Sequence, residues 1–174
     1  MRTTWQSLSN ETKPLTFLLA LTFLFLFSCS EEKPKPEPKD DFQNAQDAYD
    51  RQDYETAYKL LAPLGEQGHA FAQSKLGFKY EKGQGLPQDD KEAVKWYRLS
   101  AEQGNAEAQL NLGLMYDFGQ GVPQDYVSAH MWFNRCGSSG DKDCVSSIRH
   151  IEKMMSPSQI EKAQEMARNW KPKK

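Results

Sequence analysis

The 174-residue sequence has almost no excess charge of either sign, few cysteines and few histidines. Its 22 basic and 24 acidic side chains give a formal net charge of −2, which provides no strong field to attract nucleic acid or an anionic membrane surface. Three cysteines are too few for a disulfide-rich miniprotein. The histidines, His69, His130 and His150, are far apart in the sequence and form no His-x-x-x-His pair. We therefore expect no metal, no cofactor and no nucleic-acid partner.

Charge is also absent from residues 14–27 (PLTFLLALTFLFLF), which follow a polar segment that carries Arg2 and Lys13. This order is typical of a secretory signal peptide. The alternative is an uncleaved membrane anchor. However, about 14 helical residues reach only about 21 Å, which is short of a hydrocarbon core of about 30 Å. We predict that residues 1–28 are a signal peptide that is removed.

The sequence LFSC at residues 26–29 is similar to the lipobox of bacterial lipoproteins. The resemblance implies cleavage before Cys29 and attachment of lipid to it. Ser30 resembles the sorting signal of lipoproteins that pass to the outer membrane. We therefore expect a lipid-anchored protein of the cell envelope, in the outer membrane and facing the periplasm, with the inner membrane left open as the alternative. Residues 29–41 are rich in proline and alternating charge, which predicts an extended tether.

An internal repeat follows the tether. Shifting the chain by 36 residues aligns the segment from Ala72 with the segment from Ala108, and Trp96 with Trp132. A fixed period of this size is typical of a solenoid. Apolar residues recur with helical spacing on both sides of a Gly-x-Gly loop, so each repeat is predicted to be a helix hairpin.

The shared pattern A-x-x-x-L-G-x-x-Y-x-x-G-x-G-x-P-Q-D-x-x-x-A-x-x-W resembles Sel-1-like repeats, which are relatives of the tetratricopeptide repeat. It covers residues 70–105 and 106–141. Residues 42–69 lack the Gly-x-Gly loop and look like a tetratricopeptide hairpin. The resemblance implies an all-α fold, a right-handed α-solenoid of helix hairpins. Residues 142–174 are predicted to form a C-terminal helical cap, because the sequence SPSQ at 156–159 is a strong helix start.

Membership of such a family implies a scaffold that binds a protein or peptide ligand in the cell envelope, and not an enzyme. By analogy with tetratricopeptide stacks, first-helix residues that do not face the second helix should line the concave surface. These residues are Ser74, Phe78, Lys82, Leu110, Leu114 and Phe118, with Asp117 at the rim. Three of them, Phe78, Leu114 and Phe118, would form an apolar strip. The alternative is that these side chains pack between neighbouring repeats.

Two other functions remain open at this point. Some cysteine-rich relatives have been described as penicillin-binding or β-lactam-hydrolysing, although the repeat helices here contain no Ser-x-x-Lys sequence. The chain could also be a purely structural spacer of the envelope.

Cys136 and Cys144 flank the segment GSSGDKD in a chain that we expect to be exported. A cysteine-rich branch of the same repeat family bridges its hairpins at this spacing, so the resemblance implies a disulfide between them. The alternative is two separate core cysteines.

Overall fold

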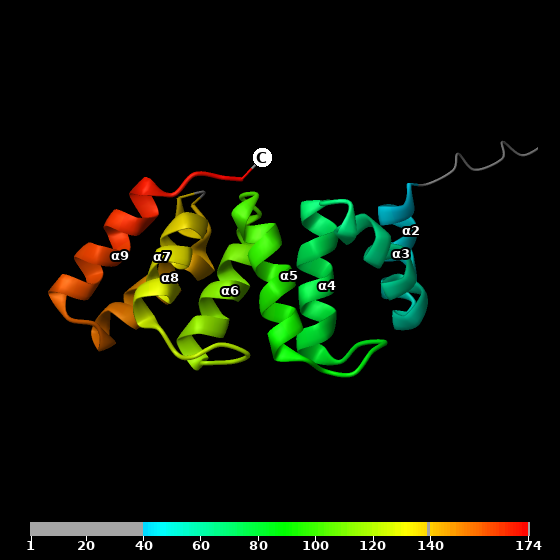
Figure 1. The fold of residues 1–174 in the computed structure, drawn as a ribbon, viewed down its shortest axis with the longest axis horizontal. Coiled ribbons are helices and arrows are strands. Elements are labelled where there is room, and N and C mark those ends of the chain that lie inside the picture. The colour runs from blue at the N-terminus through cyan, green and yellow to red at the C-terminus, as the bar shows by residue number, and fades with distance from the viewer. Residues whose placement is uncertain (1–39, 139, 174) are drawn as a thin grey trace, which may run out of the picture. The chain divides into compact units, whose positions relative to one another are not determined.

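The computed structural model describes residues 40–138 and 140–173, and the regular structure of these residues is entirely helical, which confirms the all-α prediction. The predicted signal peptide, Cys29 and nearly all of the predicted tether lie outside the described residues. The helices are α2 (Asp41–Asp50), α3 (Tyr54–Glu66), α4 (Ala70–Lys82), α5 (Asp90–Glu102), α6 (Ala106–Phe118), α7 (Tyr126–Gly137), α8 (Lys142–Ile151), the 3₁₀ helix η1 (Glu152–Met154) and α9 (Pro157–Asn169) (Figure 1). Within the described ranges, no helix is both long enough and apolar enough to cross a membrane.

Consecutive helices pair into hairpins, α2 with α3, α4 with α5 and α6 with α7, and each hairpin packs against the next. Figure 1 shows these helices side by side in chain order, as in a solenoid. Because each helix mainly contacts its neighbours along the chain, the buried hydrophobic residues form three clusters along the stack and have no single centre.

Glycines and aspartate caps fix the loop inside each full repeat. Gly83 and Gly119 end α4 and α6 in the left-handed conformation, with φ of 66° and 68°, which favours glycine. After the loop, the carboxylates of Asp89 and Asp125 each accept hydrogen bonds from two backbone N–H groups at the start of the second helix. The repeated loop sequence thus directs the chain from one helix into the next.

The second loop glycine lets each repeat contact the one before it. A Cβ atom on Gly85 would lie only 2.5 Å from the carbonyl oxygen of Tyr54, at the start of α3. Gly121 approaches the backbone of Asp90, at the start of α5, in the same way. The Gly-x-Gly loop therefore sets the spacing between hairpins as well as the turn within one.

The deepest aromatic residues are Tyr97 and Phe133, both fully buried. Each ring lies against a glycine of the preceding helix, Gly77 or Gly113, so that the two backbones come close together. Trp96, which the pattern also placed in the repeat core, is only half-buried and packs toward the previous hairpin. The sequence pattern put Trp96 and Tyr97 on one helix face but did not indicate which of them lies deeper.

The first hairpin differs from the two full repeats because a short turn replaces the long loop. Gln52, between α2 and α3, has a φ of 62°, and Asp53 then caps α3 by accepting a hydrogen bond from the backbone N–H of Thr56. A turn this short needs no Gly-x-Gly sequence, which explains why residues 42–69 lack one.

The C-terminal cap begins as predicted. Ser156 and Gln159 form a complete capping box at the start of α9, which packs against α7. The indole ring of Trp170 then packs edge-on against Trp132, at a centroid distance of 6.1 Å. Figure 1 shows the chain beyond α9 running back across the row of helices. There the backbone N–H of Lys173 donates a hydrogen bond of 2.7 Å to the carbonyl of Glu102, so this segment joins the cap to α5.

Candidate functional site

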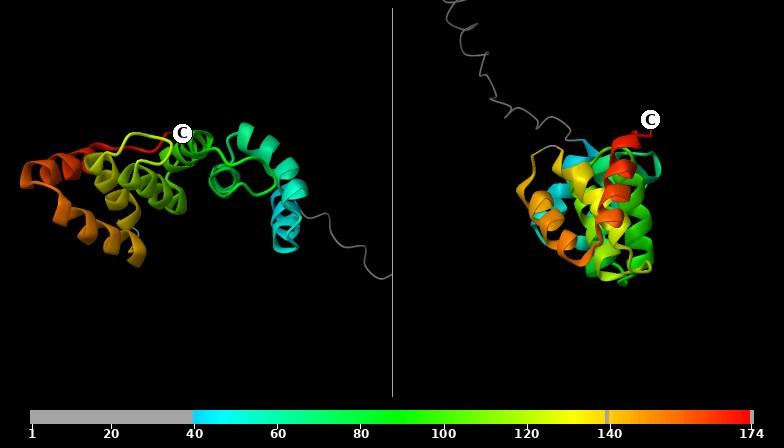
Figure 2. Two further views of the ribbon diagram at one scale, coloured as in Figure 1. Left: turned by 90° about the horizontal axis from the view of Figure 1, so that it is seen from below. Right: turned by 90° about the vertical axis from the view of Figure 1, so that its left-hand side faces the viewer.

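The first helices of successive hairpins define one face of the stack. In addition to its hairpin partner, α6 contacts both α4 and α8. Figure 2 shows that the row of helices is curved. Because first helices approach one another across hairpins, we call the side that α2, α4, α6 and α8 share the inner face.

A cavity of about 140 Å³ opens between α2 and α4 on the inner face. Three aromatic side chains line it, Phe42 and Tyr49 from α2 and Phe78 from α4. Its charged lining residues are Lys75 and Lys79 from α4 and Glu107 from α6. We call this space the inner-face cavity. Three successive first helices contribute to it, so its shape depends on the stacking of the hairpins.

Lys79 is an unusual lining residue, because only 1% of its surface is exposed. Its Nζ atom lies 3.3 Å from the carbonyl oxygen of Tyr54 and 5.1 Å from the ring centroids of both Tyr49 and Tyr54. The electron-rich ring faces partly replace the lost hydration of the ammonium group. Burial lowers the pKa of Lys79, and the carboxylate of Asp53 partly opposes that shift.

Lys75 and Glu107 form an ion pair of 2.9 Å that bridges α4 and α6 at the cavity. Both side chains are partly exposed, at 35% and 46%. Ion pairs of this kind contribute little to stability and are readily exchanged for other partners. The cavity therefore carries two cations and one anion, and the anion is already paired.

The structure divides the predicted apolar strip. Phe78 lines the inner-face cavity, whereas Leu114 and Leu110 pack against the C-terminal core cluster around Phe133. Phe118, at the end of α6, is 65% exposed and does not line the cavity. This cluster belongs to their own hairpin and to the C-terminal cap, so the two leucines are not part of an open strip.

Two predicted surface residues are in fact buried. Ser74 is 1% exposed and Asp117 is 5% exposed, and neither lines the inner-face cavity. Ser74 aligns with Leu110 of the next repeat. Asp117 is enclosed at the end of α6, where burial raises the pKa of its carboxyl group and His150 partly lowers it. Sequence periodicity could not predict the burial of these two residues, because it is neighbouring helices that bury them.

Lys82 lies at the exposed end of α4. Its Nζ atom is 5.7 Å from the ring centroid of Phe78 and pairs with the carboxylate of Glu81. It is thus close to one cavity residue but is not itself part of the cavity lining.

Most of the cavity lining was not predicted from the sequence, including Phe42, Tyr49, Lys75 and Glu107. One signal was available. Lys79 aligns with Met115 of the next repeat, a core residue that is equally buried. A lysine in the register of a core methionine could have marked this position.

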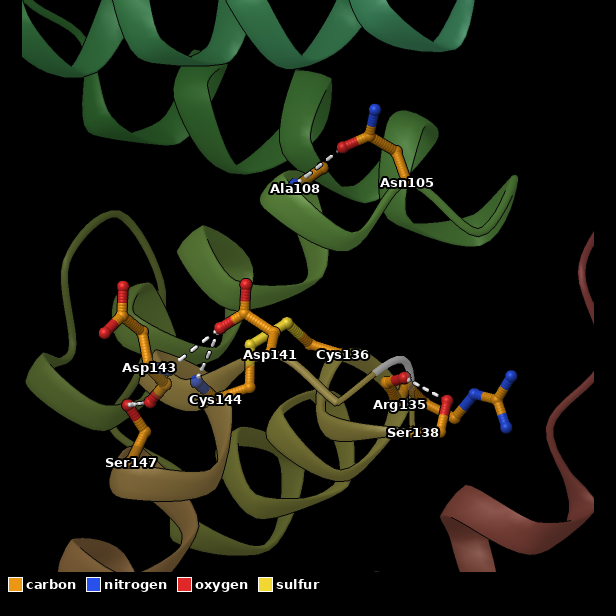
Figure 3. The surroundings of a disulfide bond; sticks show 9 residues. All are labelled: Asn105, Ala108, Arg135, Cys136, Ser138, Asp141, Asp143, Cys144 and Ser147. Carbon is orange, nitrogen blue, oxygen red and sulfur yellow. Dashed lines mark hydrogen bonds between the residues drawn. A yellow bond between two sulfur atoms is a disulfide. The ribbon is translucent and has the colours of Figure 1, made fainter.

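The two cysteines lie at the turn between α7 and α8 (Figure 3). Cys136 and Cys144 are within disulfide-bonding distance, with their Cα atoms 5.8 Å apart. Asp141 caps α8 by accepting a hydrogen bond from the backbone N–H of Cys144. Ligand atoms of these three residues come within 4.8 Å of one another, as in a metal site. A disulfide between the two sulfur atoms would leave no thiolate for a metal.

Comparison with known proteins identifies the repeats. The family model for the Sel1 repeat matches three segments, residues 47–69, 70–105 and 106–141. The first segment lies in the hairpin that lacks the Gly-x-Gly loop. No curated protein is significantly similar in sequence to the chain.

Solved structures that are similar to this one include the following two. A protective antigen of uropathogenic Escherichia coli strains, which displays an SLR fold, is 25% identical with a TM-score of 0.72. The match covers 75% of this chain and 29% of the antigen. A Sel1 repeat protein from Oxalobacter formigenes is 26% identical with a TM-score of 0.64, over 74% of this chain and 55% of that protein. The chain thus spans less than two thirds of either structure.

The repeat register, the hairpin stack and the family model agree over more than half of the sequence. The chain belongs to the Sel1 repeat family.

Proposed function

We propose that this chain is a membrane-anchored, extracytoplasmic scaffold that binds a partner protein through the inner-face cavity. Sel1 repeats typically mediate binding between proteins, and the fold is generally a non-enzymatic scaffold. The observation that carries the proposal is the cavity itself, which presents aromatic walls and a net positive lining at the junction of three first helices. Partner recognition commonly relies on such a pocket for an anchoring side chain.

Phe78 is the residue on which the proposal depends most, because it lines the cavity and belonged to the predicted apolar strip. We expect Phe78→Ser to weaken capture of the partner from solubilised envelope extracts by at least about tenfold, as for a binding hot spot. The measurement is quantitative affinity capture with the wild-type and variant chains, each also melted to compare folding.

Phe118→Ser is the matched control, because it removes the same side chain from an exposed place outside the cavity lining. It should leave capture nearly unchanged. Loss of capture with Phe118→Ser but not with Phe78→Ser would place the binding surface at the end of α6 and contradict the proposal. A spacer with no partner would show no specific capture with any variant.

The N-terminal sequence supports a lipid anchor at Cys29. We expect the protein from the membrane fraction to begin at Cys29, to lack residues 1–28, and to carry acyl chains that hold it at the membrane, since each buried methylene contributes about 0.8 kcal/mol. Mass spectrometry of the N-terminal peptide measures all three features. Recovery of Met1, or of an unmodified Cys29, would rule out this form of anchoring.

The outer membrane, on its periplasmic side, is the location that Ser30 favours. One structural neighbour is described as a protective antigen, which is in keeping with a place in the envelope. Separation of inner and outer membranes, followed by detection of the chain in each fraction, distinguishes an outer-membrane from an inner-membrane location.

We propose that Cys136 and Cys144 are joined by a disulfide in the exported protein. Closing a loop of about nine residues is expected to contribute about 2.5 kcal/mol to the free energy of unfolding by the chain-entropy estimate. Alkylation of unreduced, denatured protein should therefore modify neither thiol, and reduction should lower the thermal midpoint. Full alkylation of both thiols before reduction would contradict the disulfide.

A further inference from the structure

We infer that the inner-face cavity receives the C-terminal residue of a partner polypeptide, with an apolar side chain against the aromatic walls and its α-carboxylate beside the lysines. This inference rests on the proposed function, since it names the chemistry of the partner at the same site.

The size of the cavity limits what can enter. A cavity of about 150 Å³ lined by apolar side chains binds a molecule as large as benzene. The volume here is about 140 Å³, so the cavity suits one aromatic or branched side chain and is too small for a large organic cofactor. Phe42, Tyr49 and Phe78 give this side chain aromatic walls.

The repeat fold does not require a charged side chain at the position of Lys79. Lys79 occupies the register of Met115, so the fold accepts an uncharged side chain of similar length at this position. A buried cation costs free energy unless an anion or good acceptors compensate it. Among the residues that the structure describes, the carbonyl of Tyr54 is the hydrogen-bond acceptor within reach of the ammonium group, which has three donors. An anion in the cavity would complete this compensation.

The second cation, Lys75, stands beside the cavity in a weak, partly exposed pair with Glu107. An incoming carboxylate can share Lys75 with Glu107, or replace Glu107 as its partner, at a small cost in free energy. An apolar C-terminal residue is the one peptide unit that carries a carboxylate and an apolar side chain on the same Cα atom. An internal acidic side chain would need a second residue to fill the apolar walls.

The test uses the full-length chain in mild detergent and fluorescently labelled hexapeptides of sequence Gly-Ser-Gly-Ser-Gly-Phe, with Leu in place of Phe in a parallel set. Each is made with a free C-terminal carboxylate and as the C-terminal amide. A third peptide, the amide of Gly-Ser-Phe-Glu-Gly-Ser, carries its acid internally. Fluorescence anisotropy should show that the free carboxylate binds at least about tenfold more tightly than the amide, which lacks the charge-assisted contacts. It should also bind more tightly than the internal acid, whose carboxylate and phenylalanine ring belong to different residues.

Lys79→Met copies the residue of the next repeat and should reduce binding of the free carboxylate to the level of the amide, without weakening the amide and without lowering the thermal midpoint. Lys82→Met removes a lysine outside the cavity lining. It should leave the binding of both peptides and the thermal midpoint unchanged. Equal binding of acid and amide would overturn the inference, and so would tighter binding of the internal acid. If no peptide binds while envelope capture persists and depends on Phe78, the C-terminal inference fails and the proposed function stands.

Discussion

Replacing Phe133 with alanine is expected to lower the free energy of unfolding by about 3–5 kcal/mol, the usual cost of removing a buried aromatic ring. The side chain is fully buried in α7 and packs directly on the backbone of Gly113, so the surrounding helices cannot close the space without shifting a whole hairpin. Because small domains have only about 5–15 kcal/mol of stability, the variant should melt far below the parent. Thermal or urea unfolding measures the change.

The tryptophans provide an internal comparison. Trp132→Ala should lower the free energy of unfolding nearly as much as Phe133→Ala, since Trp132 is buried and covered by Trp170. Trp96 aligns with Trp132 but is only half-buried, so Trp96→Ala should cost less, which revises the equal effects that the repeat pattern alone would predict. Leu99→Ala, at an exposed position of α5, is the control. Equal midpoints for Phe133→Ala and Leu99→Ala would refute the packing described for the repeat core.

Gly113→Ala is expected to destabilise the protein by about 3 kcal/mol, at the upper end of the overpacking range. A Cβ atom at this position would lie 2.5 Å from Cε1 of the fully buried Phe133 ring, which has no room to move aside. Helix propensity alone predicts the opposite sign, because alanine in a helix is more favourable than glycine by about 0.5–1 kcal/mol. Chemical denaturation of the variant therefore distinguishes the effect of the close helix contact, which lowers stability, from that of helix propensity, which raises it.

Gly137→Ala is the matched control in the next helix. A Cβ atom there would meet Ile148 at 3.4 Å, an ordinary contact, so this variant should be neutral or up to about 1 kcal/mol more stable. If both variants changed stability in the same direction and by the same amount, the close approach of α6 and α7 would not be supported.

Local sequence signals predicted the parts of the fold that depend on neighbours in the chain. The period of 36 residues, the Gly-x-Gly loops and the helix start at Ser156 each act within a few residues of where they occur. They therefore predicted the hairpins and the C-terminal cap, and the family resemblance supplied how the hairpins stack.

The candidate site was harder to predict because it depends on helices that are distant in sequence. Phe42 and Glu107 lie at the same cavity although more than 60 residues separate them. Ser74 and Asp117 are on predicted surface positions, but neighbouring elements bury both. Phe78 was the residue of the predicted strip that proved to line the cavity, since its place on α4 faces the gap between α2 and α4. Helical periodicity assigns a residue to a face but does not show what covers that face.

The central claim, that a partner protein binds at the inner-face cavity, can be tested most directly by photo-crosslinking. A benzophenone amino acid would replace Gln46, which lines the cavity, or Leu99, an exposed apolar residue of α5 outside the lining. After irradiation of envelope membranes that contain the full-length chain, we predict a specific crosslinked product from position 46 and none from position 99. A partner crosslinked from position 99 but not from position 46 would contradict the account.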